Sequence, residues 1–439
     1  MNKGCDIWLA TGVDSEGCHR LNMKTIHLKS GRDQSVRQRH PWIFSGAIAR
    51  VVGDTGCSRH DTGSSRHDTG SSRHDTGVGE TVLVCAAGGE KLGLAAYSPH
   101  SSIRARMWTW NPDETVDSEF IVRRVQSALD LRRAVIPEGE TNAMRLVHGE
   151  SDGLPGVIVD RYADVLVLQC LTAGAERWRG ELVEALTTLT GAWAVFERSD
   201  VDIRALEGLP ERAGLLHGSL PDQPLIIVEN GLLFRVDIER GQKTGFYLDQ
   251  RRNRQRVREL VTDRRVLNCF CYSGAFSVYA MAGGAAEVLS VDSAPEALAL
   301  AAENAALNGI PSQKLAWQAG DVFEVLRSYR DRNLHFDAVI LDPPKFAPTS
   351  AQVQRAARGY KDINLLAFKL LNPGGLLFTF SCSGGVSAEL FDKIVAGAAL
   401  DAGVQARIIE RFSQGADHPV GLNFPEGAYL KGLALEVSG

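Results

Sequence analysis

The spacing of hydrophobic and polar residues divides the chain into three parts. From residue 23 to about 103, short apolar runs such as TIHL, ETVLVCA and LGLAAYS are separated by glycine-rich turns, which is typical of a small β-barrel or sandwich. From about 104 to 230 helical and strand patterns mix, beginning with an amphipathic helix that Asp117 opens. From about 231 to 439, near-continuous apolar runs alternate with helical stretches. That alternation predicts an α/β domain with a mostly parallel, doubly covered sheet.

The last two apolar runs, ARIIERF and YLKGLALEV, have no helix-length stretch between them. They predict an antiparallel hairpin at the edge of the parallel sheet.

Two segments carry no core pattern. Residues 1–22 lack periodicity and a signal-peptide core, which indicates a disordered tail or a misassigned start. Within 54–77, the heptad SRHDTGS repeats without any apolar position, which excludes a coiled-coil seam. Three equally spaced histidines occur there, but glycine and serine cannot hold metal ligands in place. We therefore expect a flexible, low-complexity loop insertion.

Composition narrows the class of protein. With 44% hydrophobic and 23% charged residues, the 439-residue chain is globular and long enough for about three domains. No apolar run approaches the roughly 18 residues of a membrane helix. The eight cysteines are scattered without a CxxC pair, which disfavours a metal site and favours a reducing cytoplasm.

The net charge of −5 hides two basic stretches. One spans residues 20–50 and contains His40-Pro-Trp-Ile-Phe44, where aromatic and basic side chains would suit RNA; a solvated face with a buried Trp42 is the equal alternative. The other follows GQKTGFYLDQ, in which we expect Tyr247 and Asp249 to contact a cofactor. It is an arginine-rich helix from Arg251 and Arg252 that would hold RNA phosphates or form a solvated face.

Candidate chemistry lies at the carboxyl ends of the predicted parallel strands, where such sheets bind ligands. The first strand leads into a small-residue turn, and acids end the second and third strands. The turn lacks the GxGxxG spacing that places amides on a pyrophosphate, so a nucleoside cofactor without phosphates, S-adenosylmethionine (SAM), fits better than NAD. Ordinary strand-end caps are the alternative reading. The expected cofactor residues here are Asn268, Phe270, Ser273, Gly274, Asp292 and Asp321.

The fourth strand is followed by Asp342-Pro343-Pro344-Lys345-Phe346, and the fifth ends at Cys382. The rigid prolines would let Asp342 address the amino edge of a heterocycle, with Pro343, Lys345 and Phe346 contacting the substrate. A thiolate can add to carbon 6 of cytosine and make carbon 5 nucleophilic enough to accept a methyl group. We therefore predict Cys382 and Asp342 as catalytic, against the alternative of a packed cysteine.

The chain resembles the bacterial 23S ribosomal RNA cytosine-5 methyltransferase family. The motifs KTGFYLDQR, VLNCFCYSGAFSV, DPPKF, RGYKDIN, FSCSG and ADHP carry the resemblance, and HPWIFSGA, HGESDGLPG and FERSDV extend it to the first two domains. It implies an N-terminal PUA domain, a central α/β domain and a class I SAM-dependent methyltransferase domain. It further implies methylation of cytosine 1962 in the family's rRNA numbering.

On this chain the resemblance places the nucleophile at Cys382, the cofactor acids at Asp292 and Asp321, and the substrate-edge residue at Asp342. Many RNA cytosine-5 methyltransferases carry a second cysteine where this chain has Pro344-Lys345. The base that removes the carbon 5 proton therefore stays open between Lys345, His418 and Asp417.

The sequence leaves two other functions open. The Asp-Pro-Pro corner also suits methyl transfer to an exocyclic amine, and the chain could be a non-catalytic RNA-binding ribosome-assembly factor. The expected partner is 23S rRNA or an assembling large subunit in the cytoplasm, with no membrane or metal and with a homodimer possible.

Overall fold

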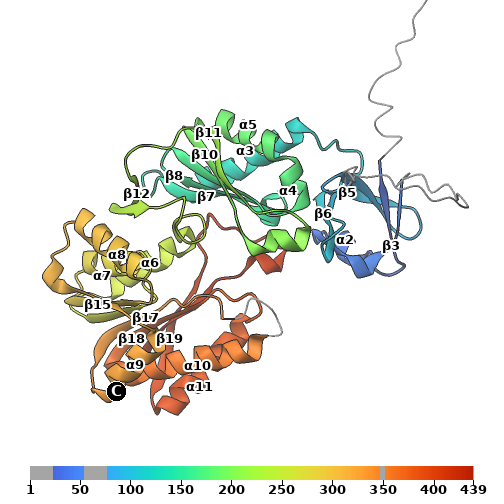
Figure 1. Cartoon of the computed structure of the whole chain (residues 1–439). Coiled ribbons are helices and arrows are strands. Elements are labelled where there is room, and N and C mark those ends of the chain that lie inside the picture. The colour runs from blue at the N-terminus through green and yellow to red at the C-terminus, as the bar shows by residue number, and fades with distance from the viewer. Residues whose placement is uncertain (1–22, 54–76, 347–351, 439) are drawn as a thin grey trace, which may run out of the picture.

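The computed structural model describes residues 23–53, 77–346 and 352–438. The predicted tail at 1–22 and the repeat loop, apart from Gly77, lie outside the described residues. Three β-sheet units follow one another along the chain (Figure 1). Among the described residues, no helix is long and apolar enough to cross a membrane.

The N-terminal unit is a six-stranded sheet with the order β2-β6-β5-β4-β1-β3. The pairing of β1 with β4 is parallel and the others are antiparallel. Strand β6 continues to Thr109, so the predicted boundary at residue 103 is wrong, because it would cut the last strand from the sheet. The elements are β1 (Thr25–Leu28), α2 (Gln34–Arg37), β2 (Trp42–Phe44), η2 (Ser45–Ala47), β3 (Ile48–Val52), β4 (Thr81–Cys85), β5 (Lys91–Tyr97) and β6 (Ile103–Thr109).

The central unit is a five-stranded sheet with the order β11-β10-β9-β8-β7. Helices α3 and α5 cover one face of it, and the Asp117 carboxylate caps α3 by accepting from the Phe120 amide, as predicted. The elements are α3 (Ser118–Val135), β7 (Ala143–His148), η3 (Gly149–Asp152), β8 (Val157–Tyr162), β9 (Val165–Cys170), α4 (Ala173–Arg177), α5 (Arg179–Thr190), β10 (Ala194–Ser199), η4 (Asp202–Glu207) and β11 (Arg212–Gly218).

A hairpin of β12 (Leu225–Glu229) and β13 (Leu232–Val236) joins the central and C-terminal units. Its buried residues Ile227 and Phe234 share one core with Val167 of the central sheet and Tyr279 of the C-terminal unit. The predicted boundary between residues 230 and 231 falls inside this hairpin. The two units therefore fold against each other rather than being joined by a linker.

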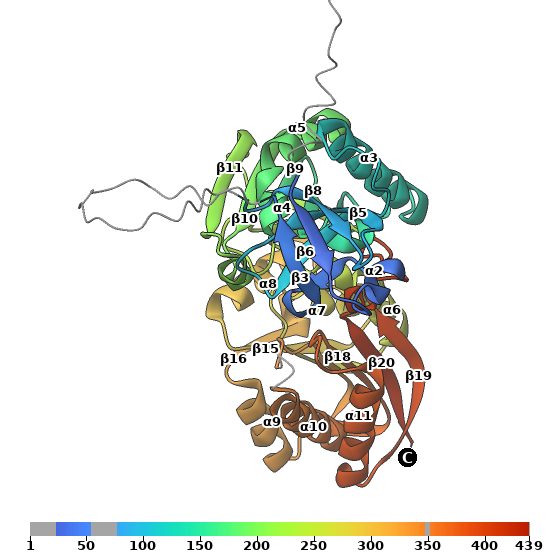
Figure 2. The ribbon, with the colours of Figure 1, turned by 90° about the vertical axis from the view of Figure 1, so that its right-hand side faces the viewer.

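The C-terminal unit is a seven-stranded sheet with the order β16-β15-β14-β17-β18-β20-β19, visible from one edge to the other in Figure 2. The first five strands are parallel, and β20 runs antiparallel between β18 and β19, so the predicted edge hairpin is confirmed. The strands are β14 (Arg265–Cys269), β15 (Glu287–Asp292), β16 (Leu315–Ala319), β17 (Phe336–Leu341), β18 (Leu371–Ser381), β19 (Gln405–Ser413) and β20 (Lys431–Ser438).

Helices cover both faces of this sheet, because its strands are apolar on both sides. One core contains residues of α9, α10 and α11, and the cores on the other face contain residues of α6, α7 and α8. The predicted α/β class with an antiparallel edge is confirmed. The helices are η5 (Leu248–Gln250), α6 (Arg251–Leu260), α7 (Ala275–Ala282), α8 (Pro295–Leu307), η6 (Ser312–Lys314), α9 (Val322–Asp331), α10 (Val353–Leu370), α11 (Ala388–Ala402) and η8 (Pro425–Gly427).

Candidate active site

The loop between β14 and α7 has an unusual backbone. Phe270, Tyr272 and Gly274 all have positive φ values, of 59°, 44° and 71°. Positive φ values strain the backbone of residues such as Phe270 and Tyr272, and they persist only where contacts with the surrounding structure hold the backbone in place. Gly274 also lies so close to α8 that a Cβ atom there would be 2.6 Å from the Ala301 side chain. The loop is therefore a tightly constrained turn at the carboxyl edge of the sheet.

Asp292 ends the neighbouring strand β15 and fastens this loop. One carboxylate oxygen accepts from the Tyr272 amide at 2.9 Å, and the other accepts from the Ala294 amide at 3.0 Å. The side chain is half-buried, and a carboxylate has about four acceptor positions. Asp292 therefore keeps acceptor capacity at the strand end, next to the loop.

The other expected cofactor residues differ in how they lie. Asn268 and Ser273 are buried: the Asn268 amide donates to the Ser277 hydroxyl at 2.8 Å, and the Ser273 carbonyl accepts from Asn304 at 2.9 Å. Asp321 is exposed and caps α9 by accepting from the Glu324 amide at 3.1 Å. Asn268 and Ser273 thus tie the strand and loop to the helices behind them, while Asp292 and Asp321 stay at the edge.

Cys382 and Asp342 meet at the next two strand ends, as predicted. The Cys382 sulfur lies 4.0 Å from the carbonyl oxygen of Pro343, the residue after Asp342. Burial and the Asp342 carboxylate raise the pKa of the thiol, while Lys243 and Lys345 act to lower it. Cys382 is partly exposed at this strand end.

Asp342 is a carboxyl group with an unusual charge state. Burial first, and then the charge of Asp249, raise its pKa to about 7. The Gln250 side-chain amide donates to it at 3.0 Å. At neutral pH a substantial fraction of Asp342 is therefore protonated and able to donate a hydrogen bond.

The neighbouring Asp249, whose charge acts on Asp342, behaves in the opposite way. Burial raises its pKa, but Lys243, His418 and the Tyr429 hydroxyl outweigh burial and hold it well below its usual range. Lys243 and Tyr429 contact the same carboxylate oxygen, at 2.9 and 2.6 Å. The Lys243 ammonium also lies 4.0 Å from the centre of the Tyr247 ring. Asp249 is thus a fixed anion beside a protonatable Asp342.

Two family profiles match the chain. One, for S-adenosylmethionine-dependent methyltransferases, covers residues 159–420, and one for PUA-like domains covers residues 26–110. Two curated relatives named ribosomal RNA large subunit methyltransferase I are each 50% identical over 94% of this chain. They come from Shewanella amazonensis, with 99% of its length covered, and Tolumonas auensis, with 98% covered. The chain belongs to the ribosomal RNA large subunit methyltransferase I family.

Solved structures show the same architecture for this methyltransferase. A protein assigned as a SAM-dependent methyltransferase from Streptococcus mutans is 21% identical, with a TM-score of 0.77 over 94% of this chain and 100% of its own. A methyltransferase complexed with SAH is 20% identical, with a TM-score of 0.78 and the same coverage. At these identities the likeness concerns the fold. It agrees with the predicted class I domain and N-terminal PUA domain.

SAM is the cofactor of this methyltransferase, and the strand-end residues fit it. Asp292 has spare acceptor positions where ribose hydroxyls would donate. One oxygen of Asp249 is buried and has no hydrogen-bond partner among the described residues, which suits a cationic donor such as the ammonium of a methionine group. Within the described ranges, no group of three or more His, Cys, Asp or Glu side chains could hold a metal ion.

The arginine-rich helix α6 is mostly structural, so the prediction that Arg251 contacts RNA is wrong. Arg251 is buried, and its guanidinium contacts Glu140 at 2.9 Å and Asp417 at 3.3 Å. Arg254 is also buried and pairs with Glu229 through two nitrogens, each 2.8 Å from a carboxylate oxygen. Because these charges are neutralised inside the protein, they cannot bind phosphate. Arg252, by contrast, is exposed.

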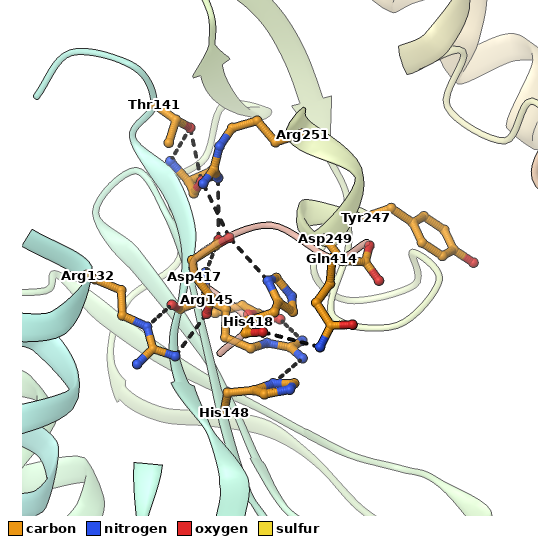
Figure 3. A network of polar contacts seen from close by, with 12 residues as sticks. Arg132, Thr141, Arg145, His148, Tyr247, Asp249, Arg251, Gln414, Asp417 and His418 are labelled. Carbon is orange, nitrogen blue, oxygen red and sulfur yellow. Dashed lines mark hydrogen bonds and ion pairs between the residues drawn. The ribbon is translucent and has the colours of Figure 1, made fainter. Parts of the chain in front are cut away.

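Asp417 and His418, two of the three candidate bases, lie in a buried network between the central and C-terminal units (Figure 3). Asp417 accepts from the Arg145 amide at 3.1 Å and contacts Arg251, and its backbone carbonyl accepts from Arg132 at 2.9 Å. These contacts place both residues in the connection between the units. Lys345 is the candidate base that is exposed at the Cys382 corner.

Phe346 does not lie as an open stacking surface. Its ring packs against Tyr360 of α10 and Phe323 of α9, with centroid distances of 4.8 Å and 6.0 Å. In this structure the Phe346 ring therefore packs against other aromatic side chains of the protein. Pro343 is buried beside it, while Lys345 is exposed.

The sequence allowed two interpretations of the basic N-terminal stretch, an RNA-contacting surface or a solvated face with a buried Trp42, and the structure agrees in part with each. Trp42 is half-buried: its indole N–H donates to Glu150 at 2.7 Å and its ring lies 4.9 Å from that of Phe424. Phe44 and Arg39 are exposed. Trp42 thus joins the PUA domain to the other two units, and Phe44 and Arg39 stay available to a partner.

Sequence reasoning missed Lys243, Gln250, Tyr429 and Lys431, which contact Asp249, Asp342 or the turn after Cys382. Lys243 and Gln250 flank Asp249 in the motif KTGFYLDQ, so their proximity could have been suspected. Lys431 begins the antiparallel strand β20 and Tyr429 lies just before it, and no local pattern indicated that this strand would border β18.

Proposed function

We propose that this methyltransferase forms 5-methylcytosine in 23S rRNA, at cytosine 1962 in the family's numbering, with Cys382 as the nucleophile. The name of the curated relatives supports rRNA of the large subunit as the substrate. The observation that supports carbon 5 is the partly exposed thiol at the end of β18, which lies 4.0 Å from the carbonyl of the Asp342-Pro343 corner.

The chemistry divides a difficult step into two. The Cys382 thiolate forms a bond to carbon 6, and the electron pair of the 5,6 double bond shifts so that carbon 5 becomes enamine-like. Protonated Asp342 stabilises this state by donating to N3, which its pKa near 7 permits. SAM, when bound, supplies the electrophilic methyl group for carbon 5. A base then removes the carbon 5 proton, the double bond re-forms and the thiolate leaves.

Asp417 and His418 are buried in the network between the units, whereas Lys345 is exposed at the Cys382 corner. The geometry therefore favours Lys345, in its neutral amine form, as the group that takes this proton. Arg252, Arg39 and Phe44 are the exposed residues of the two basic stretches that we expect to contact RNA. Arg39 and Arg252 would contact phosphates, and Phe44 would stack on an unpaired base.

The test compares Cys382→Ala with Cys85→Ala, a control at a buried cysteine of the PUA domain. Transfer of labelled methyl groups from SAM to rRNA should fall by about 10³-fold or more in C382A and stay near the parent level in C85A. Calorimetry should show unchanged SAM binding. RNA containing 5-fluorocytidine should form a stable covalent adduct with the parent and none with C382A.

Bisulfite sequencing of rRNA from cells with and without the protein locates the methylated base. Full methylation by C382A, with no fluorocytidine adduct, would assign the reaction to an exocyclic amine. Failure of the folded protein to bind SAM would instead favour an RNA-binding assembly factor.

A further inference from the structure

The turn that carries the nucleophile is held by more contacts than its own backbone provides. Cys382 follows the last residue of β18, and Ser387 caps the next helix, α11. Within the turn the Val386 amide donates to the Ser383 carbonyl at 3.1 Å. The Tyr360 hydroxyl, from α10, lies 3.0 Å from the Ser383 hydroxyl. These bonds fix the turn on the side of α10.

Lys431 fixes the turn from the opposite side. It is the first residue of β20 and pairs directly with Ser381, the residue before Cys382. Its ammonium donates to the Ser383 carbonyl at 2.8 Å and to the Val386 carbonyl at 2.6 Å. Lys431 is half-buried, and its ammonium binds these two carbonyl oxygens rather than extending fully into solvent.

We propose that Lys431 is a positioning residue for the Cys382 nucleophile: its ammonium holds the turn through the Ser383 and Val386 carbonyls and stabilises the thiolate. The inference rests on the proposed role of Cys382. It adds to that role the group that makes the thiol reactive.

The charges around Cys382 show why such a group is needed. Burial, Asp342 and Asp249 oppose formation of the thiolate, and Lys243 and Lys345 favour it. The phenols of Tyr247 and Tyr360 also face the thiol and are neutral, since burial raises their pKa values.

The three lysines near Cys382, which are Lys243, Lys345 and Lys431, differ in how far an anion or solvent offsets their positive charge. Lys243 forms an ion pair with Asp249 at 2.9 Å, which neutralises much of its field. Lys345 is exposed and screened by water. Both partners of Lys431 described above are uncharged carbonyls, so neither of these two contacts neutralises its charge. Burial lowers the pKa of Lys431 and the Cys382 thiolate raises it, which is the mutual stabilisation expected of a neighbouring pair.

The experiment measures the reactivity of Cys382 in the full chain without RNA. Iodoacetamide alkylation is followed against pH, and the Cys382 peptide is quantified by mass spectrometry so that other cysteines do not contribute. Lys431→Met keeps the apolar stem and removes the charge, Lys431→Arg keeps a charge and donors, and Lys393→Met is a control on the exposed face of α11.

We expect the pH midpoint of alkylation to rise by about one unit or more in K431M, and to match the parent in K431R and K393M. The kcat for methyl transfer should fall about tenfold or more in K431M, with the KM for SAM within twofold and partial recovery in K431R.

An alkylation profile of folded K431M that superimposes on the parent would overturn the proposal. If K431M does not fold, the K431R variant tests the proposal instead. An alkylation midpoint of K431R at a higher pH than that of the parent would contradict a role for the charge at this position. Alkylation needs no RNA, so this outcome is separate from the proposed function, which fails if C382A still methylates rRNA.

Discussion

Asp342 and Asp249 show how two neighbouring residues of the same type acquire pKa values shifted in opposite directions. Both are aspartates close to the strand ends, yet burial and a neighbouring anion raise the pKa of Asp342 to about 7. Lys243, His418 and Tyr429 hold the pKa of Asp249 well below its usual range despite its burial. Pairs of carboxyl groups separated in this way typically divide acid and base work.

Asp342→Asn should therefore stabilise the fold while damaging catalysis. Below about pH 4 Asp342 is protonated in both folded and unfolded states and has no effect; above pH 7 the folded state must bear a charge that its surroundings disfavour. Relative to the parent, D342N should gain about 1 kcal/mol or more of unfolding free energy at pH 8 and almost none at pH 4. Urea unfolding at both pH values checks this.

The same substitution should lower methyl transfer by about 10²-fold or more, because the amide cannot protonate N3. A variant with parent activity and no gain in stability at pH 8 would contradict both roles.

At the scale of elements, helix α6 shows the limit of charge counting. The sequence RRNRQRVREL suggests a basic surface, yet Arg251 and Arg254 are buried in ion pairs, and Arg256 pairs with Glu410 of β19. Helical periodicity predicts that only some arginines face inward, but their acidic partners lie far away in the chain. The partners of Arg254 and Arg256 are Glu229 and Glu410, so no local window could show them.

Arg254→Ala tests the structural reading of α6, with Arg252→Ala on the same helix as its matched control. R254A leaves Glu229 charged and buried, so we expect a loss of about 3–5 kcal/mol in unfolding free energy. R252A, at an exposed position, should change it by less than about 0.5 kcal/mol and weaken rRNA binding instead. Chemical denaturation and filter binding measure the two effects. Equal destabilisation by both variants would contradict this division.

At the scale of the molecule, the three units are joined by buried groups rather than by linkers. Trp42 connects the PUA domain to Glu150 of the central unit and to Phe424 of the C-terminal unit. Asp417 binds Arg145 and Arg251 from two different units (Figure 3). Because these charged and aromatic contacts are buried or half-buried, they fix how the PUA-like domain and the methyltransferase domain face each other.

Asp417→Asn should loosen this connection in a pH-dependent way. Burial raises the pKa of Asp417, but His418 and Arg251 outweigh it and keep the pKa well below its ordinary value. The carboxylate therefore stabilises the fold above the unfolded pKa near 4, and this contribution is lost as the pH falls through the folded value. D417N should cost about 3 kcal/mol at pH 7 and clearly less at pH 3. Thermal unfolding of D417N and the parent at the two pH values measures this effect. A stability difference between them that is as large at pH 3 as at pH 7 would refute this role.

Local sequence patterns were enough to predict the class of each unit, the strand-end positions of Asp292, Asp342 and Cys382, and the hairpin of β19 and β20. These features follow from the periodicity of apolar residues, from continuous apolar runs, and from the turns that proline and glycine form. All three are local patterns that extend over a few residues. The folded chain was needed to establish the domain boundaries at β6 and at the β12–β13 hairpin, the burial of Arg251, and the places of Asp417 and Lys431.

Those features depend on contacts between residues far apart in the chain, such as Arg251 with Asp417 and Lys431 with Ser383. A charged side chain has the same local pattern whether it faces water or a buried partner. The folded chain alone supplies the partner, and with it the difference between an RNA-binding arginine and a structural one.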